Sequence, residues 1–90
     1  MFKTYITLGF SHIHTIAGQT FDHNCVMVIN HTHKELGRDI AFALLGDKFC
    51  FEYPEQYWDD DKMNNYFKDG YKEVDQKVVD EIEANFALHM

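Results

Sequence analysis

Alternation of apolar and polar residues dominates the start of the chain. From Phe2 onward, every second residue is apolar or β-branched, and most of the residues between them are polar. Side chains two positions apart share one face of an extended backbone, so the pattern predicts a strand over residues 2–10. Ala17 and Gly18 favour a tight turn, after which residues 19–21 are expected to return as a short strand.

The longest β-forming stretch follows a second turn signal at residues 22–24. Residues 25–30 read Cys-Val-Met-Val-Ile-Asn, a nearly continuous apolar run that favours a strand in the middle of a sheet. Residues 49–53 alternate again and stop at Pro54, which has no backbone N–H to donate. The sequence therefore predicts a central strand and a later one.

A helix is predicted between these two strands. Thr32 and Glu35 have the spacing of a capping box, in which each side chain satisfies a backbone amide of the other residue. Gly46 is well placed to end the helix. The expected buried stripe consists of Leu36, Ile40 and Leu44, with Ala43 beside them.

Residues 55–70 mix aromatic side chains with acids. A short helix is expected from about Asp60 to Phe67, with the Asp59–Asp61 cluster as a solvated turn or the helix N-terminus, where acids favour the dipole. Gly70 ends this segment, and residues 71–74 are predicted as a short edge strand.

A final amphipathic helix is predicted to begin after Asp75, whose carboxylate can cap it. One face of this helix is apolar and the opposite face carries most of its acids. The apolar residues are Val78, Val79, Ile82 and Phe86, and the acids expected mostly opposite them are Asp80, Glu81 and Glu83.

The predicted order of elements is β-β-β-α-β-(α)-β-α. Neighbouring strands with helices on one face form a small two-layer α+β domain with a mainly antiparallel sheet of four to five strands. Ninety residues are one domain, here residues 1–90. A domain of this size buries only about 60–65% of the surface of its unfolded chain, so a homo-oligomer is expected.

Charge narrows the possible partners. The chain carries 8 basic and 15 acidic residues, a net charge of −7, and the whole excess of acid lies in residues 46–90. Duplex nucleic acid and anionic membranes attract basic proteins, so neither is an expected partner. The acidic half is either a solvated surface or a face presented to a basic partner. No apolar run is long enough to cross a membrane and no signal-peptide pattern opens the chain, so a cytoplasmic location is expected.

Six histidines offer candidate metal chemistry. The chain has two H-x-H pairs, and residues two apart in a strand share a face, so two imidazoles could bind one zinc ion. His31 and His33, however, lie at a predicted strand-to-helix junction, where such side chains diverge. The alternative is a set of polar residues on a solvated strand face and near a helix cap, and no complete metal motif is present. If a metal is bound, its ligands are expected among His12, His14, His23, His31 and His33.

The two cysteines are too far apart for a C-x-x-C motif, and Cys25 and Cys50 both lie among apolar neighbours. Both are expected to be reduced structural residues rather than nucleophiles, because a reactive thiol needs an electropositive, accessible site. The chain has no nucleophile elbow, phosphate-binding loop or dinucleotide fingerprint. We therefore expect no enzyme activity and no cofactor.

Arg38 is the single arginine of the chain and follows Gly37. A guanidinium binds phosphate or carboxylate in a fork and stacks on aromatic rings. It is therefore either a surface ion pair or an anion clamp beside a glycine that lets a ligand or partner approach. The aromatic residues of positions 53–71 are either core residues or exposed platforms for a flat ring or a partner.

Residues 9–53, about half of the chain, carry a family resemblance. The matching residues are Gly9, His12, His14, Gly18, Thr20-Phe21-Asp22, Cys25-Val26, Gly37-Arg38, Ala41-Phe42, Gly46 and Lys48-Phe49-Cys50-Phe51-Glu52-Tyr53. This pattern resembles a group of small, uncharacterised accessory proteins encoded by tailed bacteriophages. The resemblance transfers no catalytic residue. It implies a protein that acts in the host cytoplasm, where such proteins disarm host defences or redirect host enzymes.

Four functions remain open. The favoured one is a host-defence antagonist that sequesters a small anionic, nucleotide-like molecule in a pocket of a homo-oligomer. The expected ligand-binding residues are Arg38, Lys48, Tyr53, Tyr57, Trp58, His12 and His14. The main alternative is an acidic inhibitor that docks on a basic host protein, such as a nucleic-acid or defence enzyme. The others are a small metal-dependent enzyme or metal-binding protein that uses the histidines, and a virion or structural component.

Overall fold

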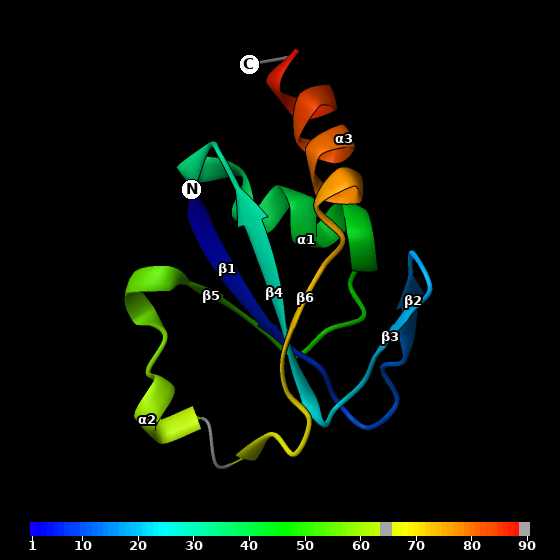
Figure 1. Ribbon diagram of the computed structural model, residues 1–90, viewed down its shortest axis with the longest axis vertical. Coiled ribbons are helices and arrows are strands. Elements are labelled where there is room, and N and C mark those ends of the chain that lie inside the picture. Colours follow the sequence, from blue (N-terminus) through cyan, green and yellow to red (C-terminus); the bar gives the residue numbers. More distant parts are fainter. Residues whose placement is uncertain (64–65, 89–90) are drawn as a thin grey trace.

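A computed structural model describes residues 1–63 and 66–88 (Figure 1). The strands are β1 (Phe2–Thr7), β2 (His14–Ile16), β3 (Gln19–Phe21), β4 (Cys25–His31), β5 (Phe51–Pro54) and β6 (Gly70–Glu73). The helices are α1 (Gly37–Leu45), α2 (Asp60–Met63) and α3 (Gln76–Ala87), with 3-10 turns η1 (Lys34–Leu36) and η2 (Glu55–Tyr57).

The main sheet has four strands in the order β5-β1-β4-β6, and β2 and β3 form a separate hairpin. β1 runs antiparallel to both β4 and β5, whereas β6 joins β4 in parallel. The α+β fold class and the mainly antiparallel sheet are therefore confirmed. The central position of the 25–30 strand and the edge position of the 71–74 strand are confirmed too, while β1 ends at Thr7 rather than at residue 10.

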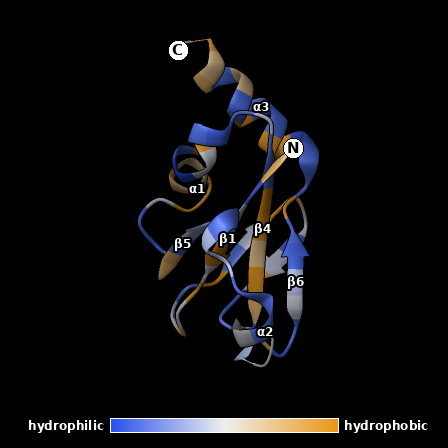
Figure 2. Ribbon diagram, turned by 90° about the vertical axis from the view of Figure 1, so that its left-hand side faces the viewer, coloured by the Kyte–Doolittle hydropathy of each residue, from blue (hydrophilic) through white to orange (hydrophobic). Residues whose placement is uncertain are grey.

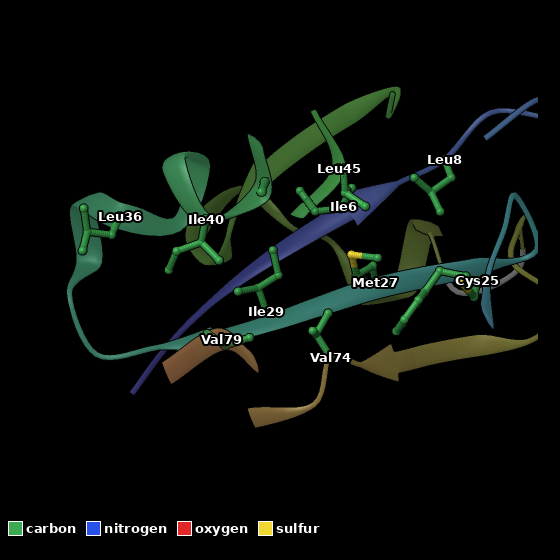
Figure 3. Close-up of a cluster of buried hydrophobic side chains, with 12 residues drawn as sticks. Ile6, Leu8, Cys25, Met27, Ile29, Leu36, Ile40, Leu45, Val74 and Val79 are labelled. Atoms are coloured by element: carbon green, nitrogen blue, oxygen red, sulfur yellow. The ribbon is translucent and has the colours of Figure 1, made fainter. Parts of the chain in front are cut away.

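The core lies between one face of this sheet and the helices α1 and α3. Ile6 of β1, Ile29 of β4, Ile40 of α1 and Val79 of α3 all belong to this core, and none of the four side chains is exposed (Figure 3). The β2–β3 hairpin adds the buried Phe21 to the same cluster. In Figure 2, β4 carries a long hydrophobic stretch through the middle of the molecule.

The predicted turn at Ala17–Gly18, the helix end at Gly46 and the helix cap at Asp75 are confirmed. Ala17 and Gly18 both adopt positive φ, 51° and 79°, the left-handed pair that a two-residue hairpin turn requires. Gly46 follows α1 at φ 65°, and its amide donates back to the carbonyl of Phe42. The carboxylate of Asp75 accepts hydrogen bonds from the amides of Lys77 and Val78 at the start of α3.

The predicted capping box is wrong. No side chain caps η1 or α1, and Glu35 is exposed. The backbone amides of Thr32 and His33 are instead bound by Glu83, which reaches them from α3. This carboxylate is 50 residues away in sequence, so a local pattern could not reveal it.

The buried stripe of α1 is also rotated from the prediction. The helix proper begins at Gly37 after a 3-10 turn, and a 3-10 turn advances the chain by a different angle per residue. The buried residues are Leu36, Gly37, Ile40, Ala41 and Leu45, whereas Leu44 is half-buried and Ala43 is exposed. Glu83 of α3 was expected on the solvent face and is buried.

One segment lies against the second face of the sheet. The predicted helix from Asp60 to Phe67 is observed as α2 over Asp60–Met63, and residues 64–65 lie outside the described part. Trp58, just before α2, stacks on Tyr5, which alternates with the core-facing Ile6 along β1. Within the described residues, no helix is long and apolar enough to cross a membrane.

Candidate ligand-binding groove

A groove of about 680 Å³ opens at the end of the sheet where β1 starts and β4 finishes. Figure 1 shows the start of β1 next to the segment that leads into α1. The groove lies between this segment and the β5–η2 connection, and its apolar lining comes from Phe2 and Pro54. The start of β1, the η1–α1 segment and the β5–η2 connection thus meet at one opening.

Positive charge gathers in the groove. Lys34 of η1 and Arg38 of α1 line it, and Lys3 of β1 lies at its edge, where its ammonium pairs with Glu73 of β6 at 3.9 Å. Lys34 and Arg38 are four residues apart on the η1–α1 side, and we call this pair the cationic wall. The guanidinium of Arg38 lies 5.4 Å from the ring centre of Phe42, an interaction that steadies it. A chain of net charge −7 therefore holds a local set of cations.

Carboxylates face these cations. Glu52 of β5 and Glu55 of η2 line the groove on the opposite side, and we call them the acidic wall. Glu35 adds a third carboxylate next to the cationic wall. Ionised carboxylates only accept hydrogen bonds, whereas ammonium and guanidinium groups only donate. The groove thus suits a molecule with an anionic end and an end that carries N–H donors.

The floor of the groove is formed by His31 and Gly37, which are packed tightly together. A Cβ on Gly37 would lie 2.1 Å from Oγ1 of Thr4 and 2.9 Å from Nε2 of His31. Gly37 lines the groove, but the position a Cβ would occupy faces Thr4 and His31. Because it has no Cβ, the glycine lets the start of α1 pack closely against β1 and β4. The side chains of Thr4 and His31 occupy the space that a Cβ would take.

His31 is buried, at 1% exposure, and both of its ring nitrogens are engaged. Nδ1 lies 2.8 Å from the carbonyl oxygen of His33, an acceptor, so Nδ1 carries a proton and donates it. Nε2 lies 2.8 Å from Oγ1 of Thr4 and is hydrogen-bonded to that hydroxyl.

Glu83 holds the loop between β4 and η1. Burial alone would raise the pKa of this carboxyl, but hydrogen bonds from the amides of Thr32 and His33, together with the His33 ring, outweigh burial and hold the pKa below its ordinary value of 4.5. Glu83 is therefore an ionised carboxylate at neutral pH, fixed behind the cationic wall.

The aromatic residues expected in the ligand site are only partly together. Tyr53 and Trp58 contact each other on the second face of the sheet, with ring centres 5.3 Å apart. Tyr57 lies nearby in η2 and is 71% exposed. Arg38 lines the groove, whereas none of these three aromatic residues does.

Trp58 is held by contacts within the protein. Its ring stacks on Tyr5 with centres 4.8 Å apart and planes 9° apart. Its Nε1–H donates to Asp60 at 3.0 Å and to the hydroxyl of Tyr71 at 2.8 Å, and that hydroxyl also donates to Asp60. Burial, followed by the charge of Asp60 and Glu55, raises the pKa of Tyr5. Burial and the hydrogen bond to Asp60 raise that of Tyr71.

The remaining three expected ligand-binding residues lie at the opposite end of the sheet. His14 donates from Nε2 to the carbonyl of Lys48 at 2.8 Å, and Nδ1 of His12 accepts the amide of Gly9 at 3.0 Å. The amide of Cys50, close to Lys48, bonds to Thr7 at the far end of β1. The seven residues therefore divide among three places, of which only Arg38 belongs to the groove.

The histidines point to different partners. His23 contacts the ring of Phe10, and His33 contacts Glu83, while His12, His14 and His31 make the hydrogen bonds described above. Across residues 1–63 and 66–88, no three histidine, cysteine or acidic side chains are grouped so that they could hold a metal ion.

The cysteines differ from each other. Cys25 is buried as expected, and burial raises the pKa of its thiol. Cys50 is exposed, so the expectation that it is a buried structural residue is wrong. The prediction used the apolar neighbours of Cys50 in sequence, but one of them, Phe51, is itself exposed at the first position of β5.

Sequence reasoning missed Lys3, Lys34 and the acidic wall. The four-residue spacing of Lys34 and Arg38 was a usable signal, because such residues are neighbours on a helical surface. Lys3 and Glu52 lie on different strands, and only the β5-β1-β4 order brings them to one opening.

Comparison of the chain with protein-family models, with curated proteins and with solved structures yields no match. The chemistry of the groove is therefore what indicates its function.

Proposed function

We propose that this protein is a non-enzymatic binding protein that sequesters a small anionic, nucleotide-like molecule in the groove. The observation that carries the proposal is the pairing of Lys34 and Arg38 on one side of a groove in a net acidic chain. The resemblance to bacteriophage accessory proteins supports the setting, which is the withholding of a nucleotide signal from a host defence.

The phosphate of such a ligand belongs at the cationic wall. Arg38 can bind two phosphate oxygens in a fork, and Lys34 supplies a compact second charge. α1 also begins at the groove, at Gly37, and the first N–H groups of a helix favour an anion.

The nucleobase belongs at the acidic wall. Glu52 and Glu55 can accept hydrogen bonds from an exocyclic amino group, as carboxylates accept from cytosine in nucleic-acid recognition. Phe2 and Pro54 offer apolar contact to the ring. Adenine, guanine and cytosine carry such an amino group and uracil does not. We therefore expect AMP to bind more tightly than UMP.

The test is calorimetric titration of untagged protein with AMP and UMP, using Arg38→Ala, Lys34→Ala and Lys77→Ala. Removal of a charge-assisted hydrogen bond costs about 1.5–3 kcal/mol, so each wall variant is expected to weaken AMP binding by about tenfold or more. Lys77→Ala removes an exposed lysine of α3 outside the groove and should leave affinity unchanged. Equal affinity in all three variants would exclude the groove as the site.

An acidic inhibitor of a basic host protein is the second candidate. Its supporting observation is that Asp80 and Glu81 of α3 and the Asp59–Asp61 cluster are exposed, within the half that carries the net charge. Binding of this kind weakens steeply with salt. Native mass spectrometry of untagged protein from infected cells separates the two, because a released mass of a few hundred daltons indicates a nucleotide and a larger one a protein. The same spectrum reports the number of subunits.

A further inference from the structure

The cationic wall is anchored from α3, which lies outside the groove. Lys34 follows directly after Thr32 and His33, and Arg38 lies four residues further on, in the first turn of α1. No side chain of this segment caps η1 or α1. The anchor that replaces a local cap is Glu83, which is 4% exposed.

Glu83 grips two consecutive backbone amides. The amide of Thr32 lies 3.0 Å from each carboxylate oxygen, and the amide of His33 lies 2.7 Å from Oε2. The ring Nδ1 of His33 is 3.1 Å from the same oxygen. A carboxylate bound by several N–H groups in a buried place holds the backbone more firmly than one exposed hydrogen bond would.

Hydrogen bonds and packing contacts connect these clamped amides to the groove floor. The carbonyl of His33, one residue after the first clamped amide, accepts from Nδ1 of His31. His31 is hydrogen-bonded through Nε2 to the hydroxyl of Thr4 on β1 and packs against Gly37, the first residue of α1. The segment is therefore held at both sides of Lys34, by Glu83 before it and by the His31–Gly37 packing after it.

We propose that Glu83 is a positioning residue for anion binding, which sets the direction of Lys34 and Arg38 and couples the docking of α3 to occupancy of the groove. The coupling is reciprocal, because a ligand that favours the clamped wall must also favour docked α3. This inference rests on the proposed function for its ligand, but the clamp itself can be tested without one.

The experiment compares Glu83→Gln with Glu81→Gln, which removes the same charge from an exposed position of the same helix. Amide hydrogen exchange is measured first without ligand, and calorimetric titration with AMP follows. Glu83→Gln is expected to raise exchange at Thr32, His33 and Lys34–Arg38 by about tenfold and to weaken AMP binding by about fivefold or more, the lower end of typical coupling. Glu81→Gln is expected to change neither.

Saturating AMP gives the reciprocal measurement. It should slow exchange in α3 of the wild-type protein and lose this effect in Glu83→Gln. If Glu83→Gln does not fold, Thr4→Val tests the other end of the same network, because it removes the hydroxyl bonded to His31 at nearly constant volume. Thr4→Val should likewise raise exchange at Lys34–Arg38 and weaken AMP binding.

The outcomes separate the two proposals. If wild-type protein binds AMP and Glu83→Gln binds it equally well, the coupling is wrong and the proposed function stands. If the wild-type protein binds no nucleotide, the proposed function fails. Exchange at Lys34–Arg38 then still decides the positioning role, since unchanged rates in Glu83→Gln would overturn it.

Discussion

At the scale of single residues, Gly37 shows how context reverses an ordinary preference. Glycine inside a helix normally costs about 1 kcal/mol relative to alanine, because its backbone is more flexible in the unfolded chain. Gly37 has ordinary helical dihedral angles, with φ −53°, so no special backbone conformation requires it. Its role is the close approach of α1 to Thr4 and His31.

Gly37→Ala is therefore expected to destabilise the protein. The added Cβ would lie 2.1 Å from Thr4 Oγ1, and the buried neighbours have to shift. Overpacking of this kind costs about 1–3 kcal/mol, more than the gain in helix propensity. The midpoint of urea unfolding measures the change. Thr4→Ala in the same chain should recover part of the loss, and a Gly37→Ala protein as stable as wild type would contradict this account of the floor.

At the scale of elements, the segment 55–61, here called the strap, depends on one side chain. Its residue Trp58 stacks on Tyr5 and donates to Asp60 and Tyr71, which ties η2 and α2 to β1 and β6. The strap also carries Glu55 of the acidic wall. The anchoring ring and the groove lining thus belong to the same short segment.

Trp58→Ala is expected to release the strap while the core between the sheet and α1 persists. Loss of a half-buried aromatic ring and its hydrogen bonds should lower the free energy of unfolding by about 2–3 kcal/mol. Amide hydrogen exchange over residues 55–61 should become faster, whereas the far-ultraviolet circular dichroism spectrum should change little. Tyr57→Ala, at a position 71% exposed, is the matched control and should change neither. Exchange over residues 55–61 in Trp58→Ala like that of the wild type would show that the strap is held by other contacts.

Elements with a local cause could be predicted from the sequence. The Ala17–Gly18 turn, the Asp75 cap and the Gly46 helix end each depend on residues within a few positions, and all three were found. The predicted start of the first helix was wrong because its cause is not local. Glu83 accepts hydrogen bonds from the amides of Thr32 and His33, which lie 51 and 50 positions away, and no spacing rule covers such a separation.

At the scale of the whole molecule, the candidate site depends on contacts between residues that are distant in sequence, and these could not be predicted. Arg38 lines the groove, but the aromatic residues expected beside it lie on the other face of the sheet. The expected histidines and Lys48 lie at its far end. Strand order and register decide which side chains meet, and alternation along a strand indicates faces rather than neighbours.

The free energy of unfolding of the whole protein should depend on pH through the ionisation of Glu83. Its folded-state pKa lies below the ordinary value of 4.5, so folding favours the ionised form. The stabilisation is fully present above pH of about 4.5 and is lost as the pH falls through the lower folded pKa. Unfolding midpoints in urea at several pH values between about 6 and 3 measure this dependence.

Glu83→Gln isolates this contribution. An amide keeps an oxygen acceptor for one backbone N–H but has no ionised form, so the variant should be less stable at pH 7 and should lose less stability on acidification. Glu81→Gln, which changes an exposed carboxylate of the same helix, should keep the wild-type acid dependence. Parallel curves for wild type and Glu83→Gln would show that the carboxylate is not preferentially ionised in the folded protein, and the clamp on Thr32 and His33 would then not depend on its charge.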